Sequence, residues 1–586
     1  FLDYVTKRYE DKIPAYRAAY PDWWTDGFGS AARETAASRK THSDMTAVEG
    51  LLSMAVLKDK CLPQTTHQRI EHIHESLLFY DEHTFGASES VSDPLCENSQ
   101  VQWGEKSAYA WEAVKRTQML YETSVGLLQG DLRRGKNPTL TIFNTLNWKR
   151  SEMLTVYIDF EVIPRNQFFE ITDFQGHSLK VQPIRYRREG CYYAIFAEDI
   201  PPMGYKTFEI VFKQPSTDTG TITINNASIE NHFYKLQLNP DKGTIQSLYD
   251  KELNCELVDS SSPWELGAFI YEKLGNRDQL AQYRLDDYNR TGLSECRIID
   301  SSNGPIYQRI LLQGKSPGTD EAFGVNLEIK LYHDTKRIEL EYAIKRLPET
   351  DPSGIYVAFP FQLPEGKLAF DVQGGTVISG KNQLEGTSTD WNTVQNFVSV
   401  QNNQAQIIIG SSLIPLYQLG DINLGKFQYQ KQYERPHVYS WVMNNYWNTN
   451  FKASQEGEFR WSYHLTSSVD PSSNLATKFG WSSRIPLYAR VMPTGTENHK
   501  PTEYSAFHFE KDNFLMTSCT PSKEEGYILL NIREIDGKRT NLRILNEDGQ
   551  TIPFTIVNAI EEKLENETSE HIFEGYQNKF IKIKRF

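Results

Sequence analysis

Three stretches near the start of the chain repeat apolar side chains at helical spacing. Two of them cover residues 45–56 and 70–78. The third opens near Asn98, carries Trp111 on its apolar face, and places Gln102 as in a capping box. Three amphipathic helices in succession predict a helical bundle up to about residue 135.

From about residue 136 the periodicity changes from helical to strand-like. Short runs rich in β-branched and aromatic residues follow one another, among them TLTIFNTLNW, MLTVYIDF, YKTFEIVF, HFYKLQLN, RIELEYAI and YILLNIREI. Turn-forming triplets at 241–243, 352–354 and 547–549 separate such runs, and we expect no further long helix. The predicted fold class is therefore multidomain α+β, a three-helix bundle followed by all-β sandwiches.

The chain of 586 residues is too long for one hydrophobic core. Polar stretches at 214–221 and 520–526 suggest two of the boundaries. The expected division is a linker at 1–18, the bundle at 19–135, a small sandwich at 136–215, a large super-sandwich at 216–520 and a C-terminal β domain at 521–586.

Composition narrows the classes of partner. A net charge of -14 without a basic stripe argues against nucleic-acid binding. The six cysteines are scattered without metal-ligand or disulfide spacing. No apolar run approaches the roughly 18 residues that a membrane span needs.

The stretch PDWWTDGFGSAARETA at 21–36 places two tryptophans beside Asp26 and two glycines, just before a helix. Such tryptophans can form an apolar platform for a sugar ring, with Asp26 binding its hydroxyls. Alternatively, both rings are buried against the bundle, which is the more frequent arrangement.

The stretch DEHTFGASES at 81–90 contains a histidine that could bind a metal or simply end a helix. His72 and His74 precede His83, but residues two apart on a helix do not face each other. If His83 is a ligand, its partner ligands come from elsewhere in the fold.

The stretch at 438–457 is dense in amides and aromatics, including Asn445 and Trp447. It is either a polyol-binding loop, since amides both donate and accept hydrogen bonds, or an Asn-rich turn between strands. The sequence has no GxSxG elbow, P-loop, HExxH or dinucleotide motif, and spacing alone cannot identify paired carboxylates.

Taken together, PDWWTDGFGSAARETA, FYDEHTFGASESVSDP and NSQVQWGEKSAYAWEA resemble, in this order, the middle helical domain of glycoside hydrolase family 38 α-mannosidases. The stretch at 229–252 resembles the opening of that family's galactose-mutarotase-like super-sandwich. Those at 354–363 and 441–457 resemble later segments of bacterial-type members. The resemblance spans nearly the whole chain.

The resemblance implies a zinc-dependent, retaining enzyme that removes terminal α-mannosides from glycans. The family's nucleophile and most zinc ligands lie in an N-terminal α/β barrel, and residues 1–24 resemble the linker that leaves it. We therefore expect this chain to be the C-terminal portion of such an enzyme, inactive by itself, with its nucleophile outside the chain and the barrel as its partner.

Residue by residue, the resemblance makes His83 the single zinc ligand of this chain. Thr84 stands where many members have an aspartate, which puts that residue's contact with a substrate hydroxyl in doubt. Trp24 matches the aromatic at the sugar site, with Asp26 beside it. Asn445 and Trp447 complete the expected substrate contacts.

Further details stay open at this stage. A tyrosine of the family falls near Phe269 or Tyr271. A non-catalytic carbohydrate-binding or scaffold protein is the alternative function, and a sugar enzyme acting through the super-sandwich itself is a third. A homodimer, and a periplasmic or cytoplasmic location, are compatible with the sequence.

Overall fold

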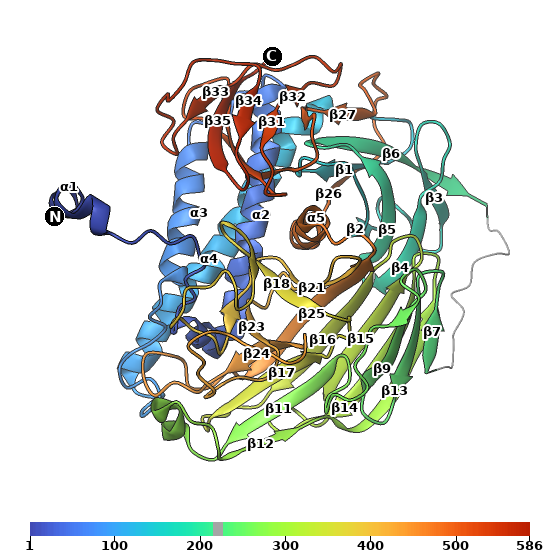
Figure 1. The fold of residues 1–586 in the computed structure, drawn as a ribbon. Helices are drawn as coiled ribbons and strands as arrows, with labels where there is room; N and C mark the ends of the chain where they lie inside the picture. Colours follow the sequence, from blue (N-terminus) through green and yellow to red (C-terminus); the bar gives the residue numbers. More distant parts are fainter. Residues whose placement is uncertain (215–226) are drawn as a thin grey trace.

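Three long helices form one side of the molecule (Figure 1). They are α2 (Ala32–Leu57), α3 (Thr66–Asp81) and α4 (Glu97–Leu128). This computed structural model describes residues 1–214 and 227–586. Met45, Leu77 and Leu120, one from each helix, lie together in the buried core of the bundle, which confirms the predicted helices.

One residue of the apolar face expected for α4, Trp111, is not buried. Trp111 is 43% exposed, whereas Ala110 and Ala113 are fully buried. The small alanine side chains let α4 approach its neighbours closely. Trp111 remains on the outside, where the Arg33 guanidinium lies 5.6 Å from its ring centre.

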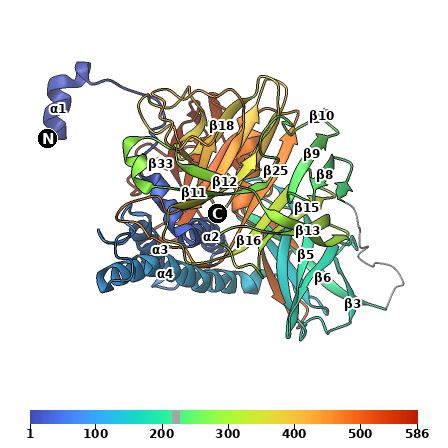
Figure 2. The same cartoon turned by 90° about the horizontal axis from the view of Figure 1, so that it is seen from below.

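Helix α1 (Leu2–Tyr9) has no buried residue and projects away from the body in both ribbon views (Figures 1 and 2). The chain then reaches the body as an extended segment. Ala19 donates a backbone hydrogen bond to Asn382 and accepts one from Leu384. These bonds fix the position of the chain just before the turn at 22–31.

Two sheets follow the bundle and pack face to face around a shared apolar core. One consists of β2 (Arg150–Asp159), β5 (Gly190–Ile200) and β4 (Lys180–Tyr186). The other consists of β26 (Tyr488–Met492), β1 (Thr139–Asn144), β6 (Gly204–Lys213), β27 (Glu503–Ser505) and, beside β6, β3 (Phe168–Thr172). Strands β26 and β27 therefore return to this small sandwich from nearly 300 residues later in the chain.

The largest unit contains three antiparallel sheets around one core. Its nine-stranded sheet has the order β13 (Ser294–Asn303), β14 (Tyr307–Lys315), β15 (Val325–Tyr332), β16 (Ile338–Arg346), β25 (Gly457–Ser468), β22 (Gln406–Gly410), β21 (Val398–Gln401), β18 (Lys367–Val372) and β19 (Gly375–Ile378).

Its six-stranded sheet has the order β12 (Tyr288–Thr291), β11 (Ala268–Leu274), β17 (Ser353–Phe359), β24 (Val438–Asn444), β23 (Leu416–Leu419) and β20 (Asn392–Thr393). A four-stranded sheet completes the unit with β10 (Cys255–Glu256), β9 (Thr244–Asp250), β8 (Tyr234–Asn239) and β7 (Ser228–Glu230).

The last strands pack on helix α2. The main sheet runs β29 (Phe514–Pro521), β30 (Tyr527–Glu534), β35 (Asn578–Lys584) and β33 (Thr555–Val557). Two short pairs flank it, β28 (His508–Phe509) with β32 (Ile544–Leu545) and β31 (Thr540–Leu542) with β34 (His571–Phe573). Leu51 and Met54 of α2 belong to their core, so α2 is buried on two sides.

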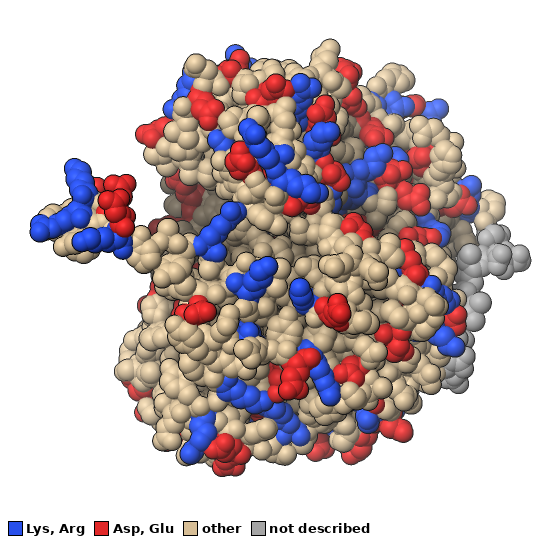
Figure 3. All heavy atoms as spheres, in the orientation of Figure 1, with Lys and Arg blue, Asp and Glu red and all other residues tan. Residues whose placement is uncertain are grey.

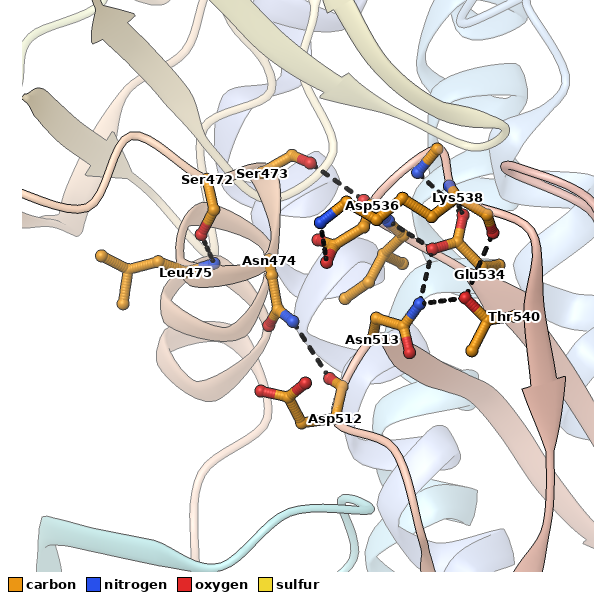
Figure 4. Close-up of polar contacts among 12 residues, drawn as sticks. Ser472, Ser473, Asn474, Leu475, Asp512, Asn513, Glu534, Asp536, Lys538 and Thr540 are labelled. Carbon is orange, nitrogen blue, oxygen red and sulfur yellow. Dashed lines mark hydrogen bonds and ion pairs between the residues drawn. The ribbon is translucent and has the colours of Figure 1, made fainter. Parts of the chain in front are cut away.

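Helix α5 (Ser473–Arg484) is a helix that the sequence pattern did not predict. With 12 residues it is less than half as long as α2 or α4, and its N-cap Ser472 was the readable signal of its start. The close-up in Figure 4 shows how its first turn is fixed: Ser472 accepts from the Leu475 N–H, and Asn474 donates to the Asp512 carbonyl at 3.1 Å. The bond to Asp512 ties α5 to the residues that lead into the C-terminal strands.

The expected division into domains stays a prediction. Strand pairing links residues 488–492 and 503–505, expected in the large sandwich, to the small one. Most of the expected boundary at 214–221 falls outside the described residues. Among residues 1–214 and 227–586, no helix is both long and apolar enough to cross a membrane. On the face shown in Figure 3, side chains of both charges are interspersed.

Candidate active site

Three segments that are far apart in the sequence meet beside the end of helix α3. They are the turn at 22–31, the loop at 82–90 and the loop at 444–456. The Phe85 N–H donates to the Asn450 carbonyl at 2.9 Å, and the Gln455 amide donates to the Gly29 carbonyl at 2.8 Å. The 444–456 loop therefore ties the other two segments together. We call the place where they meet the junction.

His83 lies at the surface of the junction with one ring nitrogen already engaged. Its Nδ1 is 2.7 Å from Glu82 Oε1, and its side chain is 58% exposed. A histidine whose Nδ1 is held by a carboxylate presents Nε2 outward, as metal-binding histidines do. The geometry therefore leaves His83 Nε2 available to a ligand.

Glu82 owes its position to Lys106 of helix α4. Partial burial opposes ionisation, but the Thr84 N–H and the Lys106 ammonium lower the pKa of Glu82 below its ordinary value. Lys106 Nζ also donates to the carbonyls of Phe79, at 2.8 Å, and Glu82, at 2.6 Å. It thus satisfies the open end of α3 and fixes the residue that holds His83.

An indole ring packs beside the exposed histidine, and a second indole packs against the first. The Trp24 ring centre lies 5.2 Å from that of His83 and 5.3 Å from that of Trp447. Trp24 is 43% exposed, so part of its face remains open. An accessible indole beside a polar nitrogen suits the mixed apolar and hydroxyl surface of a sugar.

Asp26 lies beneath this aromatic group and not at the surface. Burial raises its pKa to about 8, although the Trp447 side chain and backbone N–H groups act in the opposite direction. Among the described residues, neither Asp26 Oδ1 nor Trp447 Nε1 has a partner in good hydrogen-bond geometry. At neutral pH the Asp26 carboxyl is therefore largely protonated.

Two further predicted contacts are used inside the protein. The Thr84 hydroxyl donates to Glu82 Oε1 at 3.1 Å. The Asn445 amide donates to three backbone carbonyls, at 2.8–3.1 Å, while its oxygen accepts from the Ser353 N–H at 2.7 Å. Asn445 thus shapes the loop and has no amide hydrogen left for a ligand.

The tyrosine position left open by the resemblance is not at the junction. Phe269 and Tyr271 are 1% and 5% exposed and belong to the core of the large unit. The structure instead adds Lys106, which no sequence pattern marked. It also adds Phe451 and Gln455, which lie in the amide- and aromatic-rich stretch at 438–457 but were not singled out there. Their roles depend on contacts between segments that are remote along the chain, such as the Phe451 ring against Gly27.

The donor set at the junction fits one zinc ligand and no more. Within the described residues, no group of three or more His, Cys, Asp or Glu side chains could hold a metal ion. His83, with a free nitrogen and an anchoring carboxylate, has the chemistry of a single zinc ligand. A complete shell requires ligands from outside this group of residues.

Comparisons with known families cover two of the three segments of the junction, 22–31 and 82–90. The model of the "Alpha mannosidase middle domain" matches residues 22–128, which include Trp24, Asp26, His83 and Thr84. The model of the "Glycosyl hydrolases family 38 C-terminal domain" matches residues 229–427. The chain belongs to glycoside hydrolase family 38.

Solved structures agree with this family 38 fold. An alpha-mannosidase from Enterococcus faecalis V583 matches with a TM-score of 0.75 and 13% identity, over 100% of this chain and 72% of that one. A family 38 protein from Enterococcus faecalis gives the same score and identity, over 74% of its length. No curated protein matches the sequence.

Proposed function

We propose that this chain forms the middle and C-terminal parts of a zinc-dependent, retaining α-mannosidase that releases terminal α-mannosides from glycans. The observation that supports this most is the exposed His83, anchored through Nδ1 and flanked by Trp24. Its position in the part of the chain that matches the middle-domain model adds support.

In this proposal each residue of the junction has a limited task. His83 supplies one zinc ligand, Glu82 fixes its tautomer, and Lys106 fixes Glu82. Trp24 and Trp447 pack against the apolar face of the mannose ring. A bound zinc ion would orient and polarise the sugar hydroxyls.

The nucleophile and the acid/base carboxyl belong, in this proposal, to a catalytic barrel outside this chain. A retaining glycosidase needs two carboxyl groups about 5–5.5 Å apart, both facing the scissile bond. At the junction, Glu82 is occupied by His83 and Lys106, and Asp26 is buried. We therefore expect the chain alone neither to hydrolyse mannosides nor to bind zinc tightly.

The first test is turnover of a nitrophenyl α-mannoside by this polypeptide. We expect none, and measurable turnover would overturn the proposed division of the active site. Zinc binding is then measured by equilibrium dialysis on the chain and on His83→Ala. His177→Ala is the control, because His177 is 82% exposed and lies on the distant small sandwich. Weak binding that His83→Ala alone abolishes supports the ligand assignment; equal binding by both variants refutes it.

The sugar contact is tested separately with methyl α-mannoside and tryptophan fluorescence. Trp24→Ala is compared with Trp111→Ala, since both indoles are 43% exposed but Trp111 lies on α4 away from His83. We expect the fluorescence response only where Trp24 is intact. A response that persists in Trp24→Ala contradicts the platform role.

A non-catalytic carbohydrate-binding protein is the second candidate, favoured by the open face of Trp24 and the single potential zinc ligand. The reading frame upstream of Phe1 separates the two. A further stretch of roughly 250 residues with a His-x-Asp pair supports the enzyme. An immediate start codon or signal peptide supports the binding protein.

A further inference from the structure

The nine-stranded sheet carries a row of charged side chains on the face turned away from its apolar core. Lys330 on β15, Glu339 on β16 and His464 on β25 are direct cross-strand neighbours. Alternate residues such as Leu331 and Ile338 belong to the core on the other face. The Glu339 and His464 side chains are only 11% and 9% exposed, so this polar face is covered.

A cavity of about 940 Å³ lies over this row. Its other walls come from β2, from β26, from α4 through Tyr121 and Glu122, and from α5 through Phe479, Ser482 and Ser483. The bonds at the start of α5 in Figure 4 fix that wall to the C-terminal strands. The cavity is built from elements other than the three segments of the junction.

Most charges that line this cavity are neutralised by a partner. Four pairs account for them: Glu122 with Arg490 at 2.9 Å, Glu152 with Arg150 at 2.7 Å, Lys336 with Glu252 at 2.6 Å, and Glu339 with Lys330 at 2.9 Å. The exception is Arg337. Among the described residues, no carboxylate lies within ion-pair distance of its guanidinium and no side-chain hydrogen bond engages it, although its charge acts through space on Glu152 and Glu339.

Arg337 is held in place by its surroundings even without an ion pair. Its guanidinium carbon lies 5.7 Å from the centre of the Phe479 ring. It still acts on the charged row: it helps to lower the pKa of Glu339, where burial opposes ionisation and Lys330 favours it. The guanidinium N–H groups therefore remain available to an anion entering the cavity.

His464 lies beside Arg337 and is positioned by Glu339. Its Nδ1 is 3.5 Å from Glu339 Oε2, and that carboxylate also accepts from the Tyr332 hydroxyl at 3.2 Å. Burial, with the nearby Arg337 cation, lowers the pKa of His464, so its imidazole is neutral at pH 7. With Nδ1 turned to Glu339, Nε2 is the ring nitrogen left for a ligand.

Two buried polar atoms on the lining of this cavity also lack partners. Ser483 Oγ and Arg490 Nε have no partner in good hydrogen-bond geometry among the described residues. Buried polar groups are nearly always hydrogen-bonded, so these two atoms are open to a polar ligand in the cavity. The volume lies within the range of small-molecule sites, about 300–1,000 Å³.

We propose that this cavity is a second binding site, which takes a small hydroxylated anion such as a sugar acid or a sugar phosphate. Arg337 binds the anionic group, and His464 and Ser483 hydrogen-bond to hydroxyls. Glu339 is a positioning residue that orients the imidazole. The inference does not depend on the proposed mannosidase function, because its residues and elements are separate from the junction.

Calorimetric titration tests this with D-glucuronate and glucose 6-phosphate as probes and glucose as the neutral reference. We expect one anion, or both, to bind, and glucose to bind at least about tenfold more weakly because it lacks the charge. Binding of only one anion identifies its class as carboxylate or phosphate. Failure of both to bind at about 10 mM overturns the proposal.

The variants Arg337→Met and His464→Gln locate the binding. Arg188→Met is the matched control, since Arg188 is an exposed arginine in the turn between β4 and β5. We expect Arg337→Met to weaken anion binding about tenfold or more, and Arg188→Met to leave it unchanged. Equal binding by Arg337→Met and the unsubstituted chain refutes the site.

Hydrogen exchange on the unsubstituted chain keeps the proposal testable if Arg337→Met does not fold. The bound anion should protect amides in 332–339 and 479–486 and leave 81–90 unchanged. Protection at 81–90 alone would place the ligand at the junction and overturn the inference. Zinc binding and its loss in His83→Ala should not respond to the anion, so the two proposals can fail independently.

Discussion

Asp26 makes the stability of the turn at 22–31 depend on pH. Its carboxyl is buried and its pKa is raised to about 8, chiefly by burial. The folded chain therefore keeps a proton that the unfolded chain releases near the ordinary value of 3.8. The stabilising contribution is complete below about pH 4 and is lost as the pH rises through about 8.

The size of the stability change follows from the rise in the pKa of Asp26. Each pKa unit corresponds to about 1.4 kcal/mol, so a rise from 3.8 to about 8 amounts to on the order of 5 kcal/mol. A loss of this size is comparable with the free energies of local opening, which range from near zero up to that of global unfolding. We therefore expect the turn at 25–31 to open at alkaline pH while the bundle and sheets stay folded.

Hydrogen exchange of peptides that cover 22–31, corrected for the intrinsic rate, measures this opening at pH 5.5 and pH 8.5. We expect protection in the unsubstituted chain to fall at least about tenfold, and in Asp26→Asn to stay nearly constant, because an amide does not ionise. Asp286→Asn is the control, since Asp286 is 69% exposed. An equal loss of protection in Asp26→Asn, or a gain with rising pH, would refute the reasoning.

Two further substitutions test how the junction is held. Lys106→Met should lower the free energy of unfolding by about 1–3 kcal/mol, because two carbonyls at the end of α3 lose their donor. The melting temperature and the protection of 79–85 should fall with it. Substitution of the exposed Lys115 on α4, Lys115→Met, should change the free energy of unfolding by less than about 0.5 kcal/mol. Equal effects of the two would contradict the capping role. Gly27→Ala should destabilise the folded chain by about 1–3 kcal/mol, because the added Cβ would lie 2.1 Å from the Phe451 ring. Gly104→Ala, with open space around the added Cβ, should stabilise α4 by about 0.5–1 kcal/mol. Thermal denaturation followed by circular dichroism measures both, and the same sign for the two glycines would contradict the packing.

Local patterns were sufficient to predict most of the secondary structure. The period of the apolar residues predicted the three long helices, and β-branched runs such as RIELEYAI predicted strands, here β16. The short α5 was missed because its 12 residues did not stand out among the strand-like runs on both sides of it. Trp111 was assigned to the wrong face of α4 because packing between helices, through small residues such as Ala113, selects the buried face.

The candidate site shows where sequence reasoning stops. His83 and Trp24 were predicted together through the family resemblance, and the structure brings their rings to 5.2 Å. Asn445, from the same loop as Trp447, holds backbone carbonyls instead. No local pattern shows that Asn445 holds the backbone while Trp447 packs against Trp24, because the partners of both side chains are remote in sequence.

By itself, the sequence determined the three long helices, most strands, and the segments that could carry chemistry, because period and residue type are local properties. Only the tertiary structure decided that the 22–31, 82–90 and 444–456 segments meet and that Asp26 is buried. It also decided that Arg337 lines a cavity with no carboxylate of the described residues in ion-pair contact. The reason is physical: burial and charge pairing are set by contacts between remote segments, such as Gln455 with Gly29, and no local pattern encodes them.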